Sequence, residues 1–131
     1  MTRYLLDTNI WIALARGEEQ AVARLRALEP AQVVVCSVVR AELAFGARNS
    51  SRVEANLRGM QALLAPVDSL PFDDLAADHY GMIRADLVRI GKPIGAADLM
   101  IAAIARARDL VVVTRNTDEF VRVVGLRMEV W

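Results

Sequence analysis

The stretch Tyr4-Leu5-Leu6-Asp7-Thr8-Asn9-Ile10 decides the fold, because a short apolar run in it ends at an acidic residue. An apolar run of this length is typical of a buried strand, and Thr8 is placed to cap a helix that begins where the strand ends. In open α/β sheets, ligands bind beyond the carboxyl ends of the strands. Asp7 is therefore the first candidate site residue.

Outward from this stretch, short runs rich in Val, Leu and Ile alternate with longer amphipathic segments. Strands are predicted at residues 3–7, 33–36, 110–113 and 127–130, with a weaker fifth at 66–68. Helices are predicted to follow Thr8 and Ser37 as capping residues, and to cover residues 21–28, 52–64, 72–90 and 96–108. The alternation predicts a three-layer α/β/α fold with a central, mainly parallel sheet of about five strands.

Length and composition limit the class of protein. A chain of 131 residues suits one domain, and its apolar content of 55% indicates that some apolar surface is covered by another chain. The 16 basic residues balance 16 acidic ones, so a polyanion must be bound by local groups. Cys36 is the only cysteine, and no secretory signal or apolar span is present, which predicts a cytoplasmic location without membrane insertion.

Two further acids lie inside apolar stretches. Glu42 stands four residues after Val38 and three before Phe45, so it is expected to face inward, although a solvated acid paired with a nearby Arg is the simpler alternative. Asp98 stands three residues before Ile101 in the first turn of its helix, where the helix dipole alone also favours an acid. Burial of a carboxylate without a basic partner is costly. Three converging carboxylates therefore indicate a bound divalent metal.

A fourth polar cluster, Thr114-Arg115-Asn116-Thr117-Asp118-Glu119-Phe120, follows the strand predicted at 110–113. Thr114 and Asn116 offer neutral hydrogen-bonding groups at the strand end. Asp118 or Glu119 would add a carboxylate from the short helix beyond. Because adjacent helical residues face different ways, at most one of the two is expected to point into a site.

In their order along the chain, these clusters resemble the motifs of PIN domains of the VapC type. The matching motifs are Leu6-Asp7-Thr8-Asn9, Ser37 through Glu42-Leu43 with Gly46, Ile94-Gly95-Ala96-Ala97-Asp98, and Thr114-Arg115-Asn116 with Phe120. The resemblance covers essentially the whole chain, as a single PIN-like domain at 1–131. It implies a Mg²⁺- or Mn²⁺-dependent endoribonuclease that is the toxin of a type II toxin–antitoxin pair.

The resemblance also assigns roles by matching position. It gives metal-ligand roles to Asp7, Glu42 and Asp98, and polar roles in catalysis to Thr114 and Asn116. Many relatives carry an Asp near Asn116, and here the match falls on Asp118 or Glu119; Glu119 is favoured because it directly precedes Phe120. The implied partners are a VapB-like antitoxin, an RNA substrate of the tRNA class or an exposed ribosomal RNA loop, and a second copy of the chain in a homodimer.

Carboxylates and a metal ion would activate water for in-line attack on a phosphodiester, leaving a 5′-phosphate and a 3′-hydroxyl. His79 is the only histidine, so a mechanism that needs a pair of histidines is not expected, and His79 is assigned a structural or partner role. RNA affinity is expected from basic residues near the acidic cluster in sequence, namely Arg84, Arg89, Lys92 and Arg115.

Two other classes of protein are weighed against the ribonuclease. A Mg²⁺-dependent phosphate-handling α/β domain would need a second Asp where Asn9 stands, or, for a receiver domain, a Lys after the late strand, where the chain has Arg115. A PIN-fold binding module without activity is the second alternative, and the presence of Asp7, Glu42 and Asp98 argues against it.

Overall fold

The central sheet has five strands, all parallel, in the order β3-β2-β1-β4-β5, in a computed structural model that describes residues 1–131. The strands are β1 (Tyr4–Leu6), β2 (Val33–Cys36), β3 (Asp68–Leu70), β4 (Val111–Val113) and β5 (Arg127–Glu129). The third strand begins two residues later than the predicted 66–68, because the Val67 amide bonds to the Leu64 carbonyl and closes the preceding helix.

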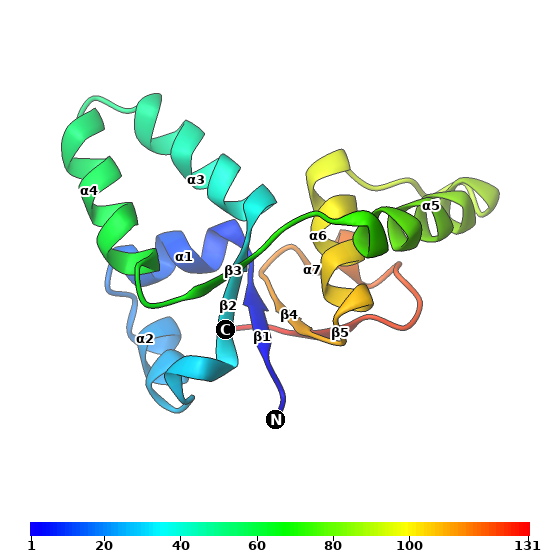
Figure 1. The fold of residues 1–131 in the computed structure, drawn as a ribbon, viewed down its shortest axis with the longest axis horizontal. Coiled ribbons are helices and arrows are strands. Elements are labelled where there is room, and N and C mark those ends of the chain that lie inside the picture. Colours follow the sequence, from blue (N-terminus) through cyan, green and yellow to red (C-terminus); the bar gives the residue numbers. More distant parts are fainter.

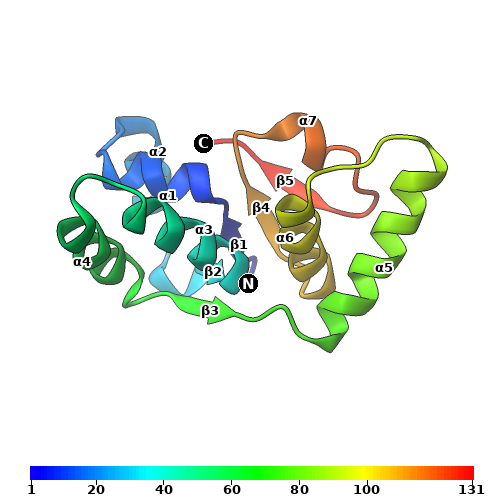
Figure 2. The ribbon, with the colours of Figure 1, turned by 90° about the horizontal axis from the view of Figure 1, so that it is seen from above.

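Seven α-helices surround the sheet. They are α1 (Thr8–Ala15), α2 (Glu19–Arg26), α3 (Ser37–Arg48), α4 (Val53–Leu64), α5 (Asp74–Arg89), α6 (Ala96–Ala107) and α7 (Thr117–Phe120), with a 3-10 turn at Pro30–Gln32. Helices α1 to α4 lie on one side of the strands and α5 to α7 on the other (Figures 1 and 2). The predicted three-layer α/β/α architecture with a parallel sheet is confirmed. None of the helices combines the length and apolarity needed to cross a membrane.

Both expected helix caps are wrong by one residue. Asp7 caps α1, its side chain accepting the Thr8 amide, and Cys36 occupies the corresponding position before α3. Ser37 is instead the first residue of α3, and its hydroxyl accepts the Phe72 amide at 3.3 Å. The reason is that each helix starts directly at the strand end, so the capping position falls on the residue that leaves the sheet.

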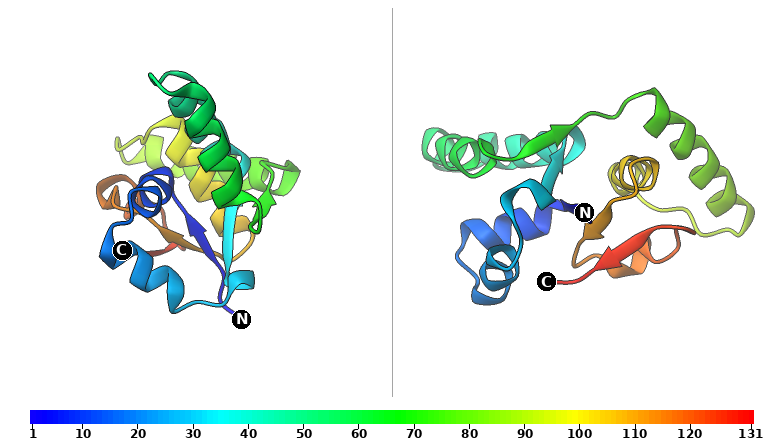
Figure 3. Two further views of the ribbon diagram at one scale, coloured as in Figure 1. Left: turned by 90° about the vertical axis from the view of Figure 1, so that its left-hand side faces the viewer. Right: turned by 60° about the horizontal axis from the view of Figure 1, so that its bottom comes forward.

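The chain changes direction across the sheet between β1 and β4. It runs from β1 to β2 and β3 on one side, and then returns to place β4 and β5 on the other side of β1. The Asp7 amide bonds to the Val113 carbonyl at 2.9 Å, which ties the ends of the two strands together. Ligand sites of open parallel sheets form at such a change of direction. The α3–α4 pair and α5 extend away from this point on opposite sides (Figure 3).

Candidate active site

The carboxyl ends of β1 and β4 carry Asp7 and Thr114, the only polar residues in the buried set. The Thr114 hydroxyl donates to Asp7 Oδ2 at 2.7 Å, and the Thr8 amide donates to Oδ1 at 2.8 Å. Burial raises the pKa of Asp7, and these two hydrogen bonds oppose that rise. The fold therefore holds a buried carboxylate, 4% exposed, in a fixed orientation at the carboxyl end of the central strand.

A second carboxylate lies beside it on the opposite layer. Asp98 sits in the first turn of α6, as predicted, and its Oδ2 accepts the side-chain amide of Asn116 at 2.6 Å. The same amide donates to Glu119 Oε2 at 3.2 Å, and the Gly95 amide donates to Glu119 Oε1 at 3.2 Å. Asn116 thus joins the two acids of α6 and α7 into one network.

The electrostatics of this network differ from those of ordinary surface acids. Burial, the Glu119 carboxyl group and the charge of Asp7 together raise the pKa of Asp98 to about 7. Hydrogen bonding with Asp98 lowers the pKa of Glu119, so the last proton that the pair holds resides on Asp98 rather than on Glu119. None of the structure's ion pairs involves Asp7, Asp98 or Glu119. The cluster therefore concentrates negative charge without a basic partner.

Glu42 does not lie where the sequence pattern places it. It is exposed rather than inward-facing, and Phe45 on the same expected stripe is 69% exposed, because α3 buries only Val39 and Ala47. The Glu42 carboxylate still meets the site from the other layer, where Oε1 accepts the Thr8 hydroxyl at 2.9 Å.

Of the two candidates for the fourth acid, the structure places only one in the site. Glu119 lies within the network, whereas Asp118 is exposed and makes no side-chain hydrogen bond. The backbone of Asn116 is also held in place, because its backbone amide donates to the Thr114 hydroxyl at 2.9 Å. Of the sequence candidates, the structure groups Asp7, Asp98, Glu119, Thr114 and Asn116, with Glu42 at the rim and Asp118 outside.

Three site features were missed from sequence. Thr8 bridges to Glu42 rather than capping α1, and the Gly95 amide holds Glu119. Asn9 Oδ1 accepts the Arg115 amide at 3.3 Å and so ties the start of α1 to the segment after β4. Thr8, Asn9 and Gly95 stand in the stretches that resemble PIN-domain motifs, but that resemblance gave none of them an individual role.

Cys36 and His79 take no part in the cluster. Burial raises the pKa of the Cys36 thiol to about 11, so the thiol stays protonated at neutral pH and is neither a nucleophile nor a metal ligand. His79 Nδ1 accepts a hydrogen bond from Arg106 Nε at 3.0 Å, near the opposite end of α6 from Asp98.

Two of the expected RNA-binding cations are engaged elsewhere. Arg115 pairs with Glu18 at 3.3 Å and donates to the terminal carbonyl of Trp131 at 3.1 Å, and Arg89 pairs with Asp86. Arg122, which was not singled out from sequence, forms no ion pair and donates to the Pro93 carbonyl at 3.1 Å.

The donor set fits a hard divalent cation. The cluster presents carboxylate oxygens, which Mg²⁺ and Mn²⁺ prefer, and a cation would offset the burial and the charge repulsion that raise the pKa of Asp98. No three of the His, Cys, Asp and Glu side chains are grouped to ligate one ion together. The convergence of three ligating carboxylates expected from sequence is therefore not found, although Mg²⁺ can be held by one or two carboxylates with several retained waters.

Comparisons with known proteins agree with this geometry. The PIN domain family model matches residues 4–126. The tRNA(fMet)-specific endonuclease VapC of Shigella flexneri is 42% identical over 131 residues, covering all of this chain and 99% of the relative. Among solved structures, the DNA-bound VapBC of Salmonella typhimurium aligns with a TM-score of 0.92 at 37% identity, covering 100% of this chain and 99% of that chain. VapBC2 of Rickettsia felis, bound to a promoter DNA fragment, aligns with a TM-score of 0.93 at 30% identity and 99% coverage of both chains. The chain therefore belongs to the PIN-domain family and, within it, to the VapC ribonucleases.

Proposed function

We propose that this protein is a metal-dependent endoribonuclease, the toxin of a toxin–antitoxin pair, and that it cleaves a structured tRNA. One observation carries the chemistry: at the change of direction of the sheet, the buried Asp7 lies close enough to the half-buried Asp98 for its charge to raise the pKa of Asp98, and neither acid has an ion-pair partner. The substrate class is supported by the name of the Shigella flexneri relative, a tRNA(fMet)-specific endonuclease.

Asp7 and Asp98 are assigned as the residues that would hold the ion, with Glu42 reaching it from the rim through water. A bound Mg²⁺ or Mn²⁺ ion would lower the pKa of water and neutralise charge on the phosphodiester during in-line attack. Thr114 keeps Asp7 oriented toward the site, and Asn116 keeps Asp98 and Glu119 together. The expected products carry a 5′-phosphate and a 3′-hydroxyl.

A VapB-type antitoxin is the proposed partner, in line with the solved VapBC complexes. A groove of about 620 Å³ runs between α1 and the α3–α4 pair, and it opens at Thr8 and Glu42 next to the acidic cluster. Its walls are mainly apolar, including Trp11, Leu43 and Met60. We assign this groove to an apolar antitoxin segment whose basic side chain reaches the carboxylates and blocks access to the metal.

The test of the catalytic assignment uses protein stripped of metal with a chelator and then incubated with total RNA. Restored Mg²⁺ or Mn²⁺ is expected to produce discrete cleavage of a tRNA, with a 5′-phosphate on the new end. Asp7→Asn and Asp98→Ala proteins run in parallel are expected to show no cleavage, while circular dichroism reports that they remain folded. Equal cleavage by the parent and both variants would overturn the assignment, and an inert parent would favour the inactive binding module.

The toxin assignment has a separate test in cells. Expression of this chain alone is expected to arrest growth, and expression of the Asp7→Asn variant at the same level is not. Co-expression with a VapB-type antitoxin that matches this toxin is expected to restore growth and to give a complex that co-purifies. Harmless expression of the parent chain at a verified level contradicts the toxin role without bearing on the chemistry.

A further inference from the structure

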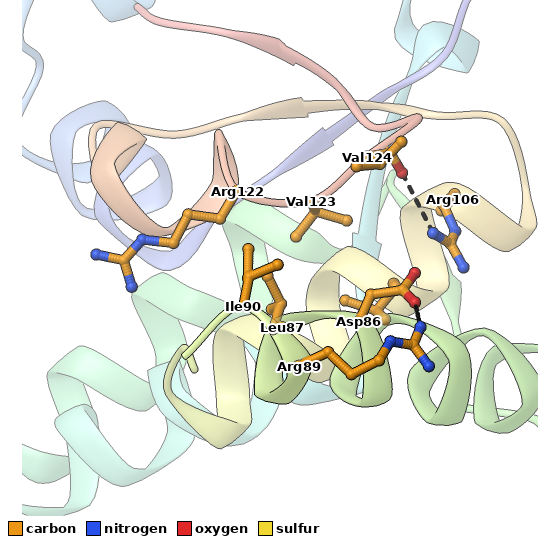
Figure 4. A pocket seen from close by; sticks show the side chains of 9 residues that line it. Asp86, Leu87, Arg89, Ile90, Arg106, Arg122, Val123 and Val124 are labelled. Atoms are coloured by element: carbon orange, nitrogen blue, oxygen red, sulfur yellow. Dashed lines mark hydrogen bonds and ion pairs between the residues drawn. The ribbon is translucent and has the colours of Figure 1, made fainter. Parts of the chain in front are cut away.

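A pocket of about 250 Å³ lies between the C-terminal part of α5 and the segment that follows α7 (Figure 4). Ile83, Leu87 and Val123 form its buried apolar floor. Ile90 and Val124 stand at the rim, 61% and 79% exposed. The pocket is therefore an apolar slot with an open mouth.

Three arginines are among the residues that line this slot. Arg122 stands at one end of it and Arg106 at the other, and Arg89 lies at the mouth, paired with Asp86 (Figure 4). Neither Arg122 nor Arg106 forms an ion pair. Three cationic groups against a single carboxylate make the lining positive, in contrast to the acidic cluster nearby.

The Arg122 end of the pocket adjoins the active site. Arg122 follows Glu119 by one helical turn, and its guanidinium donates to the Pro93 carbonyl at 3.1 Å. Two residues after Pro93, the Gly95 amide donates to Glu119. The loop before α6 thus has the acidic network against its Gly95 end, and Arg122, a lining residue of the pocket, against its Pro93 end.

We propose that this pocket, given the ribonuclease function proposed above, binds one unstacked nucleotide of the RNA next to the cleaved linkage. The base would lie on the floor of Ile83, Leu87 and Val123, since the faces of a base are apolar and every base has them. Arg122 retains unused N–H donors after its bond to Pro93, and a guanidinium binds phosphate by a planar fork of donors. The occupant is thus an RNA nucleotide, which carries both an apolar face and a phosphate.

Binding is tested directly on metal-free protein, so that the result does not depend on cleavage. Methyl NMR spectra are recorded with the four nucleoside 5′-monophosphates and with inorganic phosphate. At least one nucleotide is expected to shift the methyl signals of Leu87 and Val123, and phosphate alone is not. Val124→Trp, which fills the slot from its rim, is expected to abolish the shift. Val121→Trp is the matched control, because Val121 is 68% exposed and lies outside the slot.

The role in the reaction is tested by cleavage kinetics with the tRNA that the parent cuts. Val124→Trp is expected to raise KM about tenfold, the usual scale for loss of one stacked base, with kcat nearly unchanged. Arg122→Gln is expected to raise KM and to reduce the slope of log KM against log salt by about one. Nucleotide shifts that persist in Val124→Trp, or none with any of the four nucleotides, would overturn the pocket assignment. A parent that binds nucleotides but cuts no RNA would instead refute the proposed function.

Discussion

Asp98 and Glu42 differ more than their sequence surroundings suggest. Both lie in the first half of a twelve-residue helix, and both have apolar neighbours at helical spacing. Asp98 is bound by Asn116 in a network of short contacts, and its pKa rises to about 7 through burial and the neighbouring acids. Glu42 is exposed and has one partner, the Thr8 hydroxyl.

The difference follows from how the two helices pack. Helix α6 is buried along Leu99 and Ile101–Ala105, so the helix that carries Asp98 in its first turn is fixed in the core. Helix α3 buries little beyond Val39 and Ala47 and packs beside α4 away from the strands (Figure 1). The site therefore has a rigid half, formed by Asp7, Asp98 and Glu119, and an adjustable rim carried by α3 next to the antitoxin groove.

The largest effect is expected in the rigid half. Asp98→Asn is expected to lower kcat/KM for RNA about 10³-fold, or ~4 kcal/mol in transition-state stabilisation, because it removes a charge that holds the ion. Cleavage of the purified tRNA in Mg²⁺ measures it. Asp78→Asn, an exposed acid on α5, serves as the control and is expected to match the parent. Activity of Asp98→Asn within a few-fold of the parent would remove the distinction between the two halves.

Thr114→Val is expected to destabilise the protein by about 2 kcal/mol. It leaves Asp7 Oδ2 without its donor, with only the Thr8 amide still bound to Oδ1, and it leaves the Asn116 amide without its acceptor; unsatisfied buried groups cost roughly 1–3 kcal/mol. Urea unfolding at neutral pH measures the change. Thr117→Val, at the start of α7 and free of side-chain hydrogen bonds, is expected to change stability by less than about 0.5 kcal/mol. Equal stability of the two variants would contradict the assigned role of Thr114.

At the rim, Glu42→Gln is expected to lower kcat/KM only about tenfold, the smaller end of the range for residues that act around a metal site. Gln keeps an acceptor for the Thr8 hydroxyl, and the exposed position leaves stability unchanged. The same tRNA assay measures the effect, with Glu54→Gln on α4 as an exposed control. A loss as large as that of Asp98→Asn would show that the rim is as strictly held as the rigid half.

The pH dependence of stability sharpens the same contrast. The pKa of Asp98 is about 7 in the folded protein, against an ordinary value of 3.8. Between these values the folded chain holds a proton that the unfolded chain has released, so metal-free protein is expected to lose stability as pH rises through this range. Thermal unfolding in chelator at several pH values measures it. Asp98→Asn is expected to flatten the pH dependence of stability, and Glu42→Gln is expected to preserve it. The reverse pattern would place the titrating proton on Glu42 and contradict its assignment to Asp98.

The smallest expected effect on cleavage distinguishes Asp118 from Glu119, the adjacent acids of α7. Asp118→Asn is expected to leave cleavage within about twofold of the parent, since exposed surface changes have little effect. Glu119→Gln is expected to lower cleavage about tenfold, because it weakens the network through Asn116 and the Gly95 amide. Interchanged results would move the fourth acid to Asp118.

The sequence predicted the sheet, the strand-end position of Asp7 and the placement of Asp98, because each depends on local signals. Runs such as Val111-Val112-Val113 are buried wherever they occur in a parallel sheet. The prediction that Glu42 faces inward was wrong, because helical spacing identifies a stripe of residues but not whether another element packs on it. On α3 that stripe is largely exposed to solvent. The pairing of Arg115 with Glu18 joins residues 97 apart, which no local pattern predicts.

Binding of Mn²⁺ distinguishes the two halves of the site without requiring RNA, because electron paramagnetic resonance counts the free ion. The parent is expected to bind Mn²⁺ at pH 7.5, Asp98→Asn to weaken binding by more than about tenfold, and Glu42→Gln to weaken it by less than about threefold. Asp98→Asn protein that binds Mn²⁺ as tightly as the parent would show that Asp98 does not hold the ion.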